Sequence, residues 1–83
     1  MSDKFDADAI RELDACGLFC PEPVMLLHNK IRDIEPGSLL RIIATDPSTS
    51  RDIPKFCVYL GHELVEHFEQ DKKYIYLVRK KIE

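Results

Sequence analysis

The chain has 83 residues, 45% of them hydrophobic and 33% charged, and fifteen acidic residues outweigh twelve basic ones to give a net charge of −3. This length allows one small domain with a single core between two packed layers. The longest apolar runs fall far short of the roughly 18 residues of a membrane span, and the negative charge has the wrong sign for neutralising phosphates. The composition therefore excludes membrane integration, and we expect no direct contact with nucleic acid.

The first nine residues are polar and show no hydrophobic period, which predicts a flexible lead-in over residues 1–9 and a single domain over residues 10–83. The acidic start lacks the apolar stretch of a secretory signal, so we expect a cytoplasmic protein with reduced thiols.

The first half of the chain is typical of a β-α-β unit. Ile10 to Ala15 fits a short strand, and apolar residues at helical spacing predict a helix from Glu22 to Ile34. Leu39 to Ala44 is a nearly continuous apolar run, as in a buried strand. Such a crossover is right-handed in almost all proteins and makes its two strands parallel.

The second half predicts another helix followed by a hairpin. An apolar stripe ends at Gly61, and Pro54 must lie in or near the first turn, which favours a helix start close to Ser50. Glu63 to Gln70 and Tyr74 to Lys80 fit the two arms of a hairpin. The order β-α-β-α-β-β predicts an α/β two-layer sandwich, with two helices covering one face of a four-stranded mixed sheet.

The most informative segment is Cys20-Pro21-Glu22-Pro23 at the start of the first helix. Proline is tolerated in the first helical turn but breaks a helix interior, so both prolines belong to that turn and leave Cys20 at or next to the N-cap. The positive end of the helix favours a thiolate there, while Glu22 opposes it by charge repulsion. We expect an exposed and modestly activated cysteine.

The other two cysteines fit different roles. Cys57 shares a stripe with other apolar residues of the second helix, which indicates a core position. Cys16 lies in the turn before Cys20, where it is either a tolerated loop thiol or a chemical partner. Together with a histidine these two thiols make only a weak metal pattern, because no second pair of cysteines exists. We expect no metal and no cofactor.

From about Leu13 to Lys80 the chain resembles the TusA family of sulfur carrier proteins, also called the SirA-like family. The segments that carry the resemblance are Leu13-Asp14-Ala15, Gly17-Leu18, Cys20 to Met25, Asp46-Pro47, Arg51 to Pro54 and Phe56-Cys57. The resemblance implies the same β-α-β-α-β-β fold. It also implies that Cys20 takes sulfur from the persulfide of a cysteine desulfurase.

The resemblance further implies a route for that sulfur. In TusA proper the next acceptor is a cysteine of the TusBCD complex, and the sulfur ends in the 2-thiouridine of the wobble position of certain transfer RNAs. Cys16 departs from the family pattern and could resolve a persulfide on Cys20 as an internal disulfide. His28 also departs, because a basic residue is usual at its position.

A partner surface is expected beside the thiol. Helical spacing places Met25, His28 and Arg32 on one flank of the first helix, where an exposed methionine suits transient docking. The same flank could equally be an ordinary solvated face. Asp46 and Arg51 are expected to border the same rim.

We therefore predict a monomeric persulfide carrier with Cys20 as the sulfur-bearing nucleophile. Pro21 and Pro23 fix its exposure, and Glu22 modulates it or contacts partners. Turnover would belong to the partner enzymes, for which the carrier acts as a co-substrate. One alternative is a redox-sensing or regulatory binding module that toggles Cys16 and Cys20. Another is sulfur delivery to molybdenum cofactor synthesis or to sulfur oxidation, because the carrier does not itself choose the acceptor.

Overall fold

The computed structural model of the protein describes residues 10–82. The predicted lead-in, residues 1–9, therefore lies outside the described residues. The elements in chain order are β1 (Ile10–Ala15), α2 (Glu22–Asp33), β2 (Leu39–Ala44), α3 (Thr49–Leu60), β3 (Glu63–Gln70) and β4 (Lys73–Arg79).

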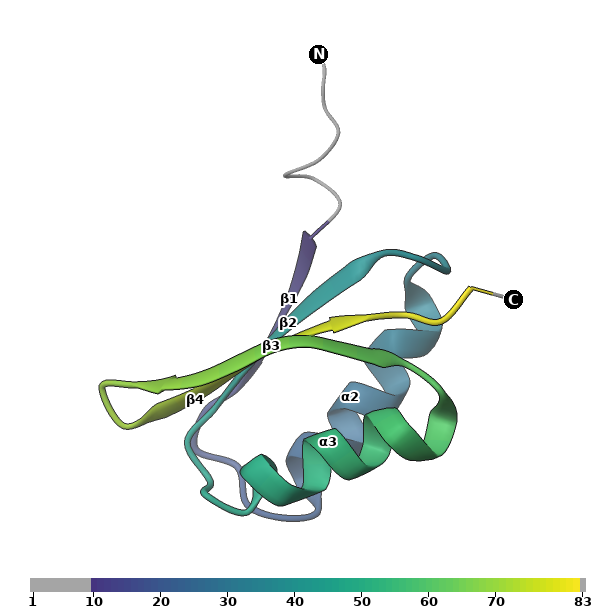
Figure 1. Cartoon of the computed structure of the whole chain (residues 1–83). Coiled ribbons are helices and arrows are strands. Elements are labelled where there is room, and N and C mark those ends of the chain that lie inside the picture. Colours follow the sequence, from purple (N-terminus) through teal and green to yellow (C-terminus); the bar gives the residue numbers. More distant parts are fainter. Residues whose placement is uncertain (1–9, 83) are drawn as a thin grey trace.

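The strands form one mixed sheet in the order β1-β2-β4-β3. β1 and β2 are parallel, as expected for a β-α-β unit, whereas β4 is antiparallel to both of its neighbours. α2 and α3 lie side by side on one face of this sheet (Figure 1). The predicted two-layer fold is confirmed.

The core lies between the helices and the sheet because each element turns one apolar face inward. Alternate residues of β2 are buried, and the buried residues of α2 recur at helical spacing. The core consists of Leu27, Ile31, Ile34, Leu40, Ile42, Ile53, Phe56, Cys57, Tyr76 and Val78. Cys57 is 1% exposed, which confirms its predicted core position. Burial raises the pKa of its thiol to about 11.

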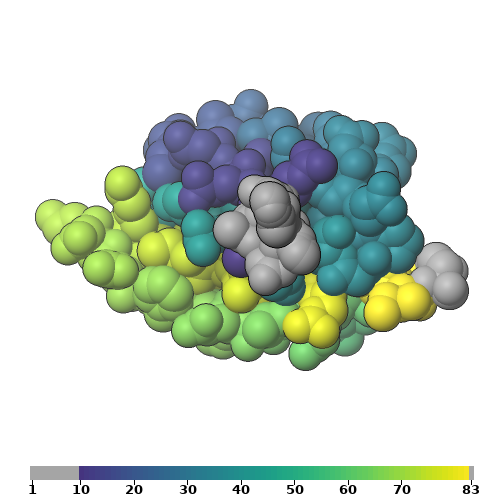
Figure 2. Space-filling view, turned by 90° about the horizontal axis from the view of Figure 1, so that it is seen from above, coloured from purple at the N-terminus to yellow at the C-terminus, as the bar shows by residue number. Residues whose placement is uncertain are grey.

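Two boundaries differ slightly from the prediction. α2 ends at Asp33, because Ile34 adopts an extended conformation as the C-cap while its side chain stays in the core. β4 runs from Lys73 to Arg79, since Lys73 already pairs with Gln70 across a turn of two residues. The light-green tip of this hairpin projects beyond the body of the molecule (Figures 1 and 2).

The prediction for Pro54 was wrong in one respect. α3 begins at Thr49, close to the expected start, but Pro54 lies inside the helix and beyond its first turn. The helix can begin earlier because backbone bonds from Thr49 to Asp46 and from Ser50 to Pro47 already close its first turn. Pro54 has no N–H to offer the carbonyl of Ser50. Ser50 is an exposed residue, so water is available as a partner for that carbonyl. Across residues 10–82, neither helix has the length and apolar character needed to cross a membrane.

Candidate functional site

Cys20 lies directly before the N-cap residue of α2, which is Pro21. Pro21 follows a cis peptide bond, and its carbonyl accepts a hydrogen bond from the backbone N–H of Met25 at 3.0 Å. Pro23 lies in the first helical turn and is buried. The Cys20 side chain is exposed, so the expectation of an exposed thiol beside the helix N-cap is confirmed.

Asp46 fixes the loop that carries the thiol. One of its carboxylate oxygens accepts the backbone N–H of Cys20 at 2.7 Å and the hydroxyl of Ser48 at 2.8 Å. The other accepts the backbone N–H of Ser48 at 3.1 Å. The hydrogen bonds from Cys20 and Ser48 lower the pKa of the Asp46 carboxyl, because they favour its charged form. Asp46 therefore joins the loop after β2 to the loop before α2.

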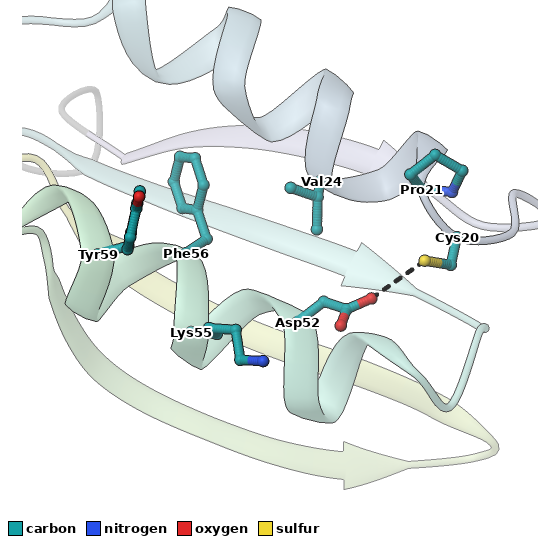
Figure 3. Close-up of a pocket in the computed structure, with 7 residues that line it drawn as sticks. All are labelled: Cys20, Pro21, Val24, Asp52, Lys55, Phe56 and Tyr59. Carbon is teal, nitrogen blue, oxygen red and sulfur yellow. Dashed lines mark hydrogen bonds between the residues drawn. The ribbon is translucent and has the colours of Figure 1, made fainter.

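Asp52 contacts the sulfur atom itself. The Cys20 thiol donates a hydrogen bond to Oδ2 of Asp52 at 3.2 Å, drawn in Figure 3. The other oxygen, Oδ1, accepts Nε of Arg51 at 3.2 Å. Asp52 lies on the first turn of α3, so its contact with Cys20 joins the starts of the two helices.

The expectation of a modestly activated thiol was wrong, because the pKa of Cys20 is raised above its ordinary value. The main cause is the hydrogen bond to Asp52, followed by desolvation and by the negative charge of the same carboxylate. A hydrogen bond with Ser48 acts in the opposite direction but is outweighed. The position at a helix start was predicted correctly, but the nearby carboxylate of Asp52 was not.

The thiol opens onto a groove between α2 and α3 of about 440 Å³. In Figure 3, Val24 projects from α2 and Phe56 from α3 toward the space between the helices. The groove is lined by Cys20, Pro21, Val24, Asp52, Lys55, Phe56 and Tyr59. The α3 residues of this lining were not foreseen as site residues, because the contact between α2 and α3 was not part of the prediction.

The structure separates the residues of the predicted partner face. Met25 is 57% exposed and lines a second depression together with Glu22. The His28 ring instead packs edge-on against Phe56 of α3, with ring centroids 5.7 Å apart. Arg32 donates a hydrogen bond to Asn29 on its own helix at 3.2 Å. Among the five predicted residues, only Asp46 and Arg51 take part in the hydrogen bonds around Cys20 described above.

Cys16 makes contacts of its own. Its backbone N–H donates to Oδ1 of Asp14 at 3.0 Å, and a hydrogen bond between its thiol and Asp14 raises the pKa of that thiol. Cys16, Cys20 and Cys57 are all free cysteines. Within residues 10–82, no three potential metal ligands of the histidine, cysteine, aspartate or glutamate type lie together.

The fold and the site define a class of protein: a small two-layer domain that presents one cysteine thiol at the mouth of a groove between its two helices. Residues 11–80 match the family described as "Sulfurtransferase TusA". The chain belongs to the TusA family.

Similar proteins come from several pseudomonads. The protein described as "Sulfur carrier protein TusA" of Pseudomonas paraeruginosa is 70% identical over 74 residues, which are 89% of this chain and 91% of that relative. The protein of the same description from Pseudomonas fluorescens is 68% identical over 68 residues, covering 82% of each chain. A crystal structure of a SirA-like protein from Desulfitobacterium hafniense has the same fold, with a TM-score of 0.72 at 23% identity. That comparison covers 89% of this chain and 99% of the other.

Proposed function

We propose that the protein is a sulfur carrier whose Cys20 accepts sulfur from the persulfide of a cysteine desulfurase and passes it to a second protein. The observation that carries the proposal is the position of Cys20, which is exposed and opens onto an inter-helix groove. Its highly similar relatives are described as sulfur carrier proteins, which supports the same role here.

The transfer needs no oxidant and no cofactor. The electron pair of the Cys20 thiolate forms a bond to the outer sulfur of the donor persulfide, and the sulfur–sulfur bond of the donor breaks. The donor's inner sulfur leaves as a thiolate and takes up the proton that Cys20 has lost. The products are a Cys20 persulfide and a donor thiol. Delivery repeats the exchange, with a thiolate of the acceptor attacking the outer sulfur on Cys20.

The neighbouring residues have supporting roles in this proposal. Pro21 and Pro23 hold Cys20 outside the helix, and Glu22 lies where it can modulate the thiol or contact a partner. The partners would dock around the groove and the adjoining surface of α2. The residues that we assign to this docking are Met25, His28, Arg32 and Arg51 on the surface, together with Asp46, which is only 8% exposed.

We assign the route of the sulfur by family membership. The acceptor would be a TusBCD-type complex, and the sulfur would serve the 2-thiolation of wobble uridine in transfer RNA. The carrier would act in the cytoplasm as a monomer, since it must visit two partners in turn, and its acidic composition fits contact with proteins better than with RNA.

The test is the intact mass of the reduced protein after incubation with a cysteine desulfurase and cysteine. We expect the wild type to gain one sulfur atom and Cys20→Ser to gain none. Cys57→Ser is the matched control, because Cys57 is buried in the core and should not affect loading. Retention of the gain in Cys20→Ser would overturn the proposal.

The same experiment separates the carrier from the redox alternative. A loss of two hydrogen atoms that disappears in Cys16→Ser would indicate a disulfide between Cys16 and Cys20. The structure gives these two thiols different carboxylate partners, Asp14 and Asp52, which favours independent behaviour. We therefore expect Cys16→Ser to load sulfur as the wild type does.

A further inference from the structure

Asp52 contacts the sulfur atom of Cys20 directly. Carrying sulfur does not by itself require such a contact. Its Oδ2 atom lies 3.2 Å from Sγ of Cys20, and its side chain is only 20% exposed. A carboxylate in this position accepts a hydrogen bond from the protonated thiol and repels a thiolate. The contact therefore favours the less reactive form of a residue whose proposed task is nucleophilic attack.

The other groups near Cys20 do not cancel this effect. From the loop after β2, the carboxylate of Asp46 adds negative charge, and the hydroxyl of Ser48 offers a hydrogen bond that favours a thiolate. From α3, Lys55 lines the groove and Arg51 shares the Asp52 carboxylate. The Arg51 side chain is 69% exposed, so solvent screens much of its charge. On balance, the surroundings keep the pKa of Cys20 above its ordinary value.

We propose that Asp52 keeps Cys20 protonated in the unloaded protein, and that a sulfur donor activates the thiol by bringing a cationic side chain to the Asp52 carboxylate. The proposal rests on the proposed function, because it assumes that Cys20 is the atom that accepts sulfur. The free carrier is then a weak nucleophile toward small electrophiles and oxidants. This protects an exposed thiol, since oxidation follows thiolate character and accessibility.

The geometry allows a donor to reach this carboxylate. Asp52 lines the groove next to Cys20, so a protein that places a persulfide over the thiol also covers Asp52. A guanidinium or ammonium group there would pair with the carboxylate and weaken its hold on the thiol proton. The proton then leaves Cys20 and is taken up by the departing donor thiolate, so the exchange remains balanced. Asp52 would thus make the reactivity of the carrier depend on its partner.

The first test measures the alkylation of Cys20 by iodoacetamide from about pH 6 to about pH 10, in a Cys16→Ser background, with the modified peptide identified by mass. We expect Asp52→Asn to shift the rate profile to lower pH and to react roughly threefold or more faster at neutral pH. The thiolate fraction rises more steeply than nucleophilicity falls as a thiol becomes more acidic. Asp33→Asn, which removes the same charge from the far end of α2, is the matched control and should follow the parent profile. If the Asp52→Asn profile coincides with the parent profile, the proposal is overturned.

The second test measures sulfur loading by a cysteine desulfurase at increasing salt concentration. Salt screens attraction between exposed charges, so the parent protein should load more slowly as salt rises, and Asp52→Asn should depend on salt less steeply. Equal salt dependence in both proteins would overturn the role of a cationic donor group. Asp52→Ala, checked by circular dichroism, provides a second variant should the asparagine disturb α3.

The two tests distinguish this proposal from the carrier function. Iodoacetamide needs no partner, so the alkylation profile reports on Asp52 even if no sulfur is ever loaded. If Cys20 of the wild type gains no sulfur, both the carrier function and its activation by a donor are overturned. A shifted alkylation profile would in that case still show that Asp52 keeps the Cys20 thiol protonated. If sulfur loads on Cys20 but the profiles coincide, only the role of Asp52 fails.

Discussion

Two aspartates next to Cys20 have different tasks. Asp46 accepts three hydrogen bonds from the loops and is 8% exposed, so its charge is tied to backbone and hydroxyl donors. Asp52 accepts one hydrogen bond from the Cys20 thiol and another from Nε of the exposed Arg51, and therefore influences the reactive atom. The first residue positions the loop of Cys20, and the second affects its protonation.

Acidic pH should release the loop of Cys20. The carboxyl pKa of Asp46 is lowered from 3.8 by its hydrogen bonds to Cys20 and Ser48, so the bonds are complete above that value and weaken as pH falls through the lowered pKa. We expect the amide proton shift of Cys20, followed by NMR, to titrate with a midpoint below 3.8. A midpoint at or above the ordinary value would contradict this interpretation.

Replacing Asp46 with asparagine tests the same contact at neutral pH. The amide group has one acceptor oxygen for the donors of Cys20 and Ser48, whereas the carboxylate has two. Asp46→Asn should therefore abolish the acid titration and speed hydrogen exchange at the Cys20 amide severalfold. Asp33→Asn serves as the control, and equal exchange rates in both variants would show that Asp46 does not hold the loop.

At the scale of the elements, the turn between β3 and β4 has a sequence that is not optimal for stability. Asp71 and Lys72 have φ values of 53° and 64°, which residues with side chains adopt at a cost. Turns with two such residues strongly prefer Asn-Gly. We expect Asp71→Asn combined with Lys72→Gly to raise the free energy of unfolding by roughly 0.5 to 1 kcal/mol, measured by urea denaturation. Lys73→Gly is the comparison, since glycine in a strand should lower stability; a gain there as well would argue against a turn effect.

The elements themselves could be predicted because their signals are local. The two prolines after Cys20 fix where α2 begins, and Gly61 marks the end of α3. The contact between Cys20 and Asp52 could not be predicted in this way, since it spans 32 positions in the sequence and depends on how α2 packs against α3. The pKa direction of Cys20 was wrong for the same reason: the helix end is visible in the sequence, but the facing carboxylate is not.

At the scale of the whole molecule, the site lies where the two parallel strands end. The loop of Cys20 follows β1, the loop of Asp46 follows β2, and the last residues of these strands, Ala15 and Ala44, are paired. Crevices beyond the carboxyl ends of parallel strands are common binding places in α/β proteins. The β-α-β unit thus brings together two loops that are far apart in the chain, and the hydrogen bond from Cys20 to Asp46 joins them.

A chain of hydrogen bonds continues from this junction into the core. The Thr49 hydroxyl donates its only proton to the carbonyl of Asp46 at 2.7 Å. The Tyr76 hydroxyl, 2.9 Å from the same Thr49 oxygen, must therefore act as the donor in that pair. Tyr76 is 2% exposed and belongs to β4, so the central sheet is linked through α3 to the loop beside Cys20.

Tyr76→Phe should separate the stability of the fold from the chemistry of the thiol. It removes one buried hydrogen bond but leaves the bond between Thr49 and Asp46, so we expect the free energy of unfolding to fall by about 1 kcal/mol. Sulfur loading of Cys20 should be unchanged, because the carboxylate of Asp46 keeps its own contacts with the loop. Tyr74→Phe, at a half-buried position on the same strand, is the control and should change stability by less than about 0.5 kcal/mol. If Tyr76→Phe slowed loading without lowering stability, the link to β4 would act on the site instead of on the fold.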